Sequence, residues 1–147
     1  MILKKIALTL ILITSTAFSA PFFNIKRLNK APLELVLKQL SKELSEKLPK
    51  EINKFTKLTE IKSNKNSLTF IKTIDLQKAI QINNALKNEK AKVYLKKFLQ
   101  NNDKNEVCKE TIFKYVLSRG ASINYTLTDE KSNFLFKYNI DNRLCLQ

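Results

Sequence analysis

The chain has 147 residues, of which 44% are hydrophobic and 27% are charged, and its formal net charge is +14. This composition is typical of one globular domain and excludes a disordered or low-complexity chain. The absence of histidine excludes Ser-His-Asp and Cys-His catalysis and imidazole zinc sites, and a single glycine excludes a phosphate-binding loop, so we expect no cofactor.

The first twenty residues have the organisation of a secretory signal peptide. Two lysines precede an apolar run at residues 6–13, and a segment of small and polar residues follows. Cleavage between Ser19 and Ala20 would leave a signal peptide of residues 1–19 and a single α+β domain of residues 20–147. An uncleaved membrane anchor is the alternative, although the apolar run is short for a membrane-spanning helix. We therefore expect a periplasmic or secreted protein without a transmembrane helix in its mature chain.

Export changes which partners the positive charge favours. Loss of the two lysines of the signal peptide lowers the formal charge from +14 to +12. In an exported protein this charge favours an anionic envelope component, lipid or cell-wall polymer, over nucleic acid, for which the chain has no motif. The simpler interpretation is a solvated surface that keeps the protein soluble.

An amphipathic helix is predicted directly after Pro32. Its apolar stripe has a helical spacing and ends before Pro49, which disfavours helical geometry in the residue before it. The stripe consists of Leu33, Leu37, Leu40, Leu44 and Leu48. We expect this stripe to face the core. Residues 50–56 are predicted to form a short helical turn or a loop.

Two strands and a basic helical segment are predicted next. Residues 58–62 and 67–75 read as strands around a polar turn. Helical spacing resumes over residues 76–102, and a polar break at residues 88–90 divides it into two helices. The segment is rich in lysine: Lys87, Lys90, Lys92, Lys96 and Lys97. Such a helix can bind an anionic surface, whereas the simpler interpretation packs its apolar stripe, which includes Val93 and Leu95, on a sheet and leaves the lysines in water.

The last third of the chain is predicted to form a helix followed by a β-hairpin. Asp103 is a suitable N-cap for the helix, and Gly120, the only glycine, is suited to end it in a left-handed conformation. Apolar and polar residues then alternate along two strands, which predicts one wet and one buried face. The residues predicted to lie on the buried face of the hairpin are Ile123, Tyr125, Leu127, Phe134, Phe136, Tyr138 and Ile140.

Cys108 and Cys145 are the only cysteines, and an exported protein folds in an oxidising compartment. We therefore predict a disulfide between them that joins the last helix to the hairpin. Four acids lie near strand ends and turns: Asp75, Asp129, Glu130 and Asp141. A hydrolase using two carboxylates is a possible alternative function, but the sequence singles out no pair.

Several positions together carry a resemblance to a known group of proteins. They are Leu48, Pro49, Asn53, Thr56, Phe70, Cys108, Gly120, Tyr125 and Cys145. In order and spacing they resemble small uncharacterised secreted or periplasmic bacterial proteins, some of which are labelled as quorum-sensing-regulated virulence factors. The chain departs from that pattern at Asn53, where an acid is expected, and at Leu127, where a second tyrosine is expected. The resemblance implies an exported α+β domain with a disulfide, and no reaction.

These observations predict an α+β fold in which helices pack on one face of a four-stranded, largely antiparallel sheet that carries one disulfide. The predicted function is that of a non-catalytic periplasmic or secreted interaction protein with a protein partner. Two alternatives stay open: peripheral binding to an anionic envelope surface through the basic helix, and a carboxylate hydrolase.

Overall fold

The computed structural model describes residues 24–147, and the predicted signal peptide lies outside this part of the chain. In chain order the elements are α2 (Ile25–Leu28), α3 (Leu33–Ser45), β1 (Lys50–Asn53), β2 (Thr56–Asn64), β3 (Ser67–Ile74), α4 (Ile80–Leu86), α5 (Glu89–Val107), α6 (Thr111–Ser118), β4 (Ser122–Asp129), β5 (Phe134–Ile140) and α7 (Asn142–Cys145). Within residues 24–147, no helix has the length and apolar content that a membrane crossing requires.

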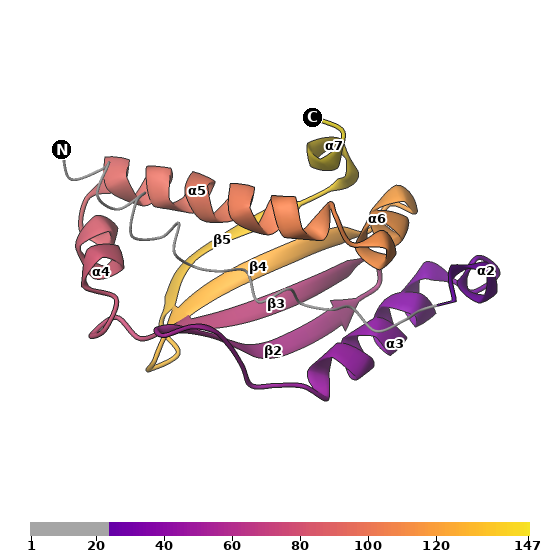
Figure 1. Ribbon diagram of the computed structural model, residues 1–147, viewed down its shortest axis with the longest axis horizontal. Coiled ribbons are helices and arrows are strands. Elements are labelled where there is room, and N and C mark those ends of the chain that lie inside the picture. Colours follow the sequence, from indigo (N-terminus) through magenta and orange to yellow (C-terminus); the bar gives the residue numbers. More distant parts are fainter. Residues whose placement is uncertain (1–23) are drawn as a thin grey trace.

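The five strands form one mixed sheet in the order β1-β2-β3-β4-β5. All neighbouring strands are antiparallel except β3 and β4, which are parallel. The predicted sheet was therefore wrong in its number of strands and missed the parallel pair. The connection from β3 to β4 contains α4, α5 and α6, and it returns the chain to the end of the sheet at which β3 began (Figure 1). A crossover of this kind makes the two strands parallel.

Strand β1 is the element that the sequence analysis assigned to a helical turn or a loop. The side-chain oxygen of Asn53 accepts a hydrogen bond from the backbone N–H of Phe55 at 3.0 Å, in a tight turn that folds β1 back onto β2. Glu51 and Lys57 lie opposite each other on the two strands and form an exposed ion pair of 3.8 Å. Because β1 has only four residues, its sequence shows no alternation from which a strand could be predicted.

The core lies on one face of the sheet. Alternate residues of β4 and β5 are buried there, together with residues of α3, α4, α5 and α6. Phe134 was predicted to join them but is 62% exposed. A bulge between Leu127 and Thr128 shifts the register of the hairpin, so that Phe134 pairs with Thr128 on the other face. That face is polar, as predicted for the hairpin, and the hydroxyls of Thr59, Thr73 and Thr128 form a hydrogen-bonded row across β2, β3 and β4.

Helix α3 packs along β2, and α5 lies near β5 at the other edge of the sheet in Figure 1. Its predicted leucine stripe is buried from Leu37 to Leu44, although the helix ends at Ser45 and not at Leu48. The hydroxyls of Ser41 and Ser45 donate hydrogen bonds to the carbonyl oxygen of Ile61, at 3.1 and 3.4 Å. Strand β1 pairs only with the first residues of β2, so these bonds cover part of an edge that would otherwise be open.

Helices α4 and α5 separate at the predicted polar break. The side chain of Asn88 caps α5 by accepting a hydrogen bond from the backbone N–H of Ala91 at 3.0 Å. Two details of the prediction were wrong. Helix α5 continues to Val107, so Asp103 lies inside it and does not cap the next helix, and Val93 is 52% exposed although it was placed in the core-facing stripe.

Gly120 ends α6, as predicted, with φ of +92°. Its N–H donates to the carbonyl oxygen of Leu117, and the N–H of Ala121 donates to that of Val116, each at 3.0 Å. No atom lies within 4 Å of the place where a Cβ would stand, so substitution would meet backbone strain without a side-chain clash.

Gly120→Ala should lower the free energy of unfolding by about 1–2 kcal/mol, because an alanine is disfavoured at positive φ. Urea denaturation of the purified protein measures this loss. Gly120→Asn is the matched control and should lose less, because asparagine tolerates the left-handed region better. Equal losses in both variants would contradict a purely backbone origin.

Candidate functional site

Three aromatic rings stand side by side on the covered face of the sheet. Phe70, Tyr125 and Tyr138 occupy register-paired positions on β3, β4 and β5. Adjacent ring centroids are 5.3 Å apart in both pairs, with interplanar angles of 23° and 25°. Phe113 of α6 meets the ring of Phe70 edge-on at 6.0 Å. The fold thus brings together two positions of the sequence pattern, Phe70 and Tyr125, which are 55 residues apart along the chain.

A buried ion pair lies beside this aromatic row. Lys72 Nζ is 2.6 and 2.7 Å from the two carboxylate oxygens of Asp103, and the side chains are only 12% and 17% exposed. The hydroxyl of Tyr138 donates to the same carboxylate at 2.5 Å. Lys72 Nζ also lies 4.6 Å from the centroid of the Tyr125 ring. These bonds connect the C-terminal third of α5 to β3 and β5.

Sequence reasoning missed this ion pair. Lys72 stands among the inward positions of β3, after Leu68 and Phe70 and before Ile74. A charge at an inward position of an apolar strand is a signal that a buried partner is required. The sequence could not identify that partner, because Asp103 lies 31 residues away and resembles a helix cap.

The hydroxyl of Tyr125 has no hydrogen-bond partner within residues 24–147, although the residue is only 6% exposed. No fully buried side-chain oxygen in this part of the chain lacks a partner, so this hydroxyl is not completely covered by the protein. Burial raises the pKa of Tyr125 well above its usual value, and the charges of Asp103 and Glu106 raise it further. Burial likewise raises the pKa of Tyr138. Both tyrosines are therefore protonated at neutral pH, and Tyr125 offers an unused hydrogen-bond donor.

The other positions of the sequence pattern lie away from the aromatic row. Leu48 and Pro49 connect α3 to β1, and Asn53 forms the turn between β1 and β2. Thr56 is buried at the start of β2, opposite Ile74, and Gly120 ends α6. Four of these residues lie around β1 and the start of β2, and Gly120 lies between α6 and β4, so they do not converge on a common site.

A pocket of about 500 Å³ lies at the end of the sheet where β3 ends and β4 turns into β5. It is lined by Asp75, Leu76, Gln77, Asn83, Asp129, Glu130, Lys131 and Asn133. Three of the four acids singled out in the sequence meet here. Asp141 does not, because it caps α7 by accepting a hydrogen bond from the backbone N–H of Leu144 at 3.2 Å.

Two acids of this pocket, Asp75 and Asp129, have lowered pKa values, which does not suit a general acid. The backbone N–H of Lys78, at 3.1 Å, holds the pKa of Asp75 below its usual value. The side-chain amide of Asn133, at 2.8 Å, does the same most strongly for Asp129. A general acid needs a raised pKa, so these two carboxylates are suited to shaping turns and unsuited to donating a proton. Within residues 24–147 no group of three or more acids and cysteines could hold a metal ion.

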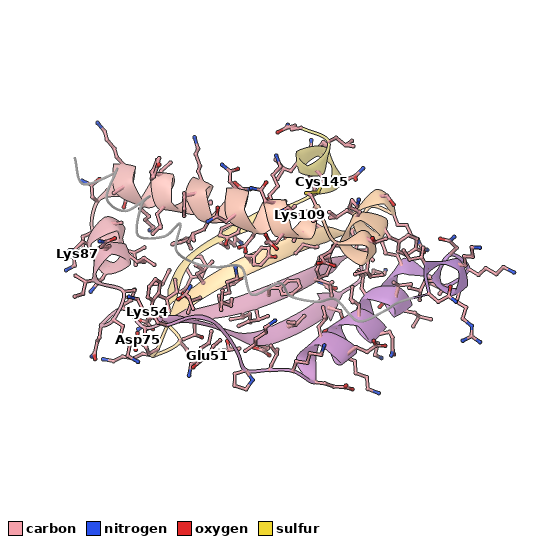
Figure 2. All side chains as sticks on the ribbon, viewed as in Figure 1. Glu51, Lys54, Asp75, Lys87, Lys109 and Cys145 are labelled. Carbon is pink, nitrogen blue, oxygen red and sulfur yellow. A yellow bond between two sulfur atoms is a disulfide. The ribbon has the colours of Figure 1, made fainter. Side chains whose placement is uncertain are left out.

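The five lysines of the basic segment lie between the end of α4 and the middle of α5. Lys87 follows α4, and the other four belong to the first half of α5. Figure 2 shows Lys87 near α4 and Cys145 near the far end of α5. The structure adds two residues that the sequence analysis did not associate with these lysines, since Val93 and Tyr94 are exposed on the same helix.

Cys108 and Cys145 form a disulfide, with their Cα atoms 5.5 Å apart. Cys108 directly follows α5, and Cys145 belongs to the short helix α7. The bridge therefore joins α7 to the corner between α5 and α6. The predicted bridge joined a helix to the hairpin, whereas Cys145 lies in α7, directly after the hairpin.

No family model matches the chain, and a search of curated proteins found no match. Solved structures do match. A Pseudomonas aeruginosa protein described as secreted is 22% identical, with a TM-score of 0.61, over 77% of this chain and 92% of that one. The pilotin EpsS of the Vibrio vulnificus type 2 secretion system is 17% identical, with a TM-score of 0.62, over 77% and 91% of the two chains.

The pilotin AspS of the Vibrio cholerae type II secretion system is 15% identical, with a TM-score of 0.56, over 77% of this chain and 92% of that chain. At these identities the comparisons show a shared fold alone. They agree with the predicted resemblance to small exported bacterial proteins and give no support to the quorum-sensing label. The chain has the α+β fold that these three bacterial proteins share.

Proposed function

We propose that this protein is exported, has no catalytic activity and binds a protein component of the bacterial cell envelope. The likeness of its fold to two pilotins of type II secretion, over nearly the whole length of each, is the observation that carries this proposal. The lowered pKa values of Asp75 and Asp129 argue in the same direction, because neither carboxylate is then suited to donate a proton. A pilotin-like role means that the protein binds one component of a secretion assembly.

The hydroxyl of Tyr125 is the contact that we assign to this partner. It is the donor left unused beside the aromatic row, and a partner that supplies an acceptor would satisfy it. Asp103 and Glu106 lie close enough to raise the pKa of Tyr125, and their charges would repel an anionic acceptor. A neutral acceptor is favoured, and a peptide carbonyl oxygen is the commonest one that a protein partner presents.

The test is capture of partners from a detergent-solubilised envelope extract by the exported, oxidised protein, with identification by mass spectrometry. Tyr125→Phe keeps the stacked ring and removes only the hydroxyl. We expect binding of the captured protein to weaken about 2- to 12-fold, which corresponds to roughly 0.5–1.5 kcal/mol for one neutral hydrogen bond.

Tyr94→Phe is the matched control, because it removes a tyrosine hydroxyl from the exposed side of α5. It should leave capture unchanged. Failure of the wild-type protein to capture any envelope protein would contradict the proposed function. Equal capture by wild type and Tyr125→Phe would leave the function standing and contradict the assigned contact.

A further inference from the structure

The outer side of α5 carries two exposed apolar residues between lysines. Lys90, Val93, Tyr94 and Lys97 follow one another at the helical spacing i, i+3, i+4 and i+7, which places them on one face. Val93 is 52% exposed and Tyr94 is 42% exposed, whereas Leu95 on the opposite side is fully buried. We call these four residues the basic face of α5.

The charge of this face is uncompensated. The chain has no acid between Glu89 and Asp103, and Asp103 points inward to Lys72. No ion-pair partner is present, among the residues that the structure describes, for Lys87, Lys90, Lys92, Lys96 or Lys97. Five lysines elsewhere are paired with acids, namely Lys57, Lys62, Lys72, Lys78 and Lys109. The first half of α5 therefore carries four lysines, and Glu89 at its start is the one acid in that half.

We propose that the basic face of α5 docks on an anionic phospholipid surface. The lysines would contact lipid phosphates, while Val93 and the ring of Tyr94 would enter the boundary between headgroups and acyl chains. A convex helix with flexible lysines matches a diffuse plane of negative charge, and two apolar side chains supply a shallow insertion. This inference goes beyond the proposed function, because it concerns lipid and a face that does not include Tyr125.

Vesicle sedimentation tests the proposal with the exported protein, purified with its disulfide intact. Vesicles of phosphatidylethanolamine and phosphatidylglycerol should bind the protein at 50 mM NaCl, and phosphatidylcholine vesicles should not. Raising the salt to 0.5 M should release it, because the screening length falls from about 10 Å at 0.1 M to about 3 Å at 1 M. Absence of binding to the anionic vesicles at low salt would overturn the proposal.

Lys90→Gln combined with Lys97→Gln should weaken binding roughly 30-fold, since each lysine near an anionic surface contributes about a fivefold change in affinity. The matched control is Lys38→Gln combined with Lys42→Gln, which removes the same charge from exposed positions of α3. Glu34 and Glu43 lie on that helix, so this control should bind nearly as the wild type does. Equal weakening by both pairs would show attraction by net charge alone and would overturn a docking face.

Val93→Ser combined with Tyr94→Ser separates lipid from a soluble polyanion at constant charge. This variant should bind the anionic vesicles about tenfold more weakly, because it removes the apolar contact, and should bind heparin as the wild type does. An unchanged affinity for vesicles would overturn the insertion and identify a polyanion, such as a cell-wall polymer, as the ligand. All these residues are exposed, so circular dichroism should show wild-type folding in every variant.

Discussion

Replacing Cys108 and Cys145 with serine will lower the free energy of unfolding by about 4 kcal/mol. The bridge closes a loop across a sequence separation of 37 residues, and the chain-entropy model assigns a loop of this size roughly 4 kcal/mol. The remaining contacts of α7 offer little to replace it, because the helix has four residues and none of them is fully buried. Urea denaturation of the double variant against the oxidised wild type measures the loss.

Two controls accompany this experiment. Wild-type protein in reductant should unfold at the same urea concentration as the double variant. Both proteins lack the disulfide, and they differ otherwise only in a serine or a cysteine at positions 108 and 145. Thiol titration of the folded, non-reduced protein should detect no free thiol. Two titratable thiols under those conditions would contradict the disulfide, and a loss below about 1 kcal/mol would show that α7 is held by its own contacts.

Asp103→Ala should lower the free energy of unfolding by about 3–5 kcal/mol, because it leaves Lys72 charged and unpaired among apolar neighbours. In the sheet, Lys72 pairs in register with Leu58 and Leu127, and only 12% of its side chain is exposed. The substitution also takes away the acceptor of the Tyr138 hydroxyl. Alanine favours a helix more than aspartate does, so intrinsic helix propensity would act in the opposite direction. Urea denaturation measures the outcome.

The matched control is Glu106→Ala, which removes an acid from the same helix. Glu106 is 43% exposed in its ion pair with Lys109, so its loss should change stability by at most about 1 kcal/mol. Lys72→Met combined with Asp103→Leu should recover most of this loss, because apolar replacement of both partners leaves no buried charge, although the Tyr138 hydroxyl still lacks its acceptor. If Asp103→Ala and Glu106→Ala lower the free energy of unfolding equally, the ion pair between Lys72 and Asp103 does not stabilise the fold as a buried pair should.

Where the sequence alone predicted well, the signal was local and periodic. The leucine stripe of α3, the break at Asn88, the end of α6 at Gly120 and the alternation along β4 and β5 each depend on residues a few positions apart. Where it failed, the local signal was too short or was overridden. Four residues cannot reveal β1, and Asp103 resembles a cap although its carboxylate is used by Lys72 and Tyr138.

The tertiary structure alone decided the candidate site. The parallel pairing of β3 with β4 places Phe70 beside Tyr125. Helix α5 belongs to the connection between these two strands, and its packing brings Asp103 to Lys72. Neither contact follows from periodicity, because strand order and register depend on which distant segments bury their apolar faces together. The sequence by itself determined most of the helices and strands and the two cysteines available for a bridge. Which side chains meet on the covered face was settled only by long-range packing.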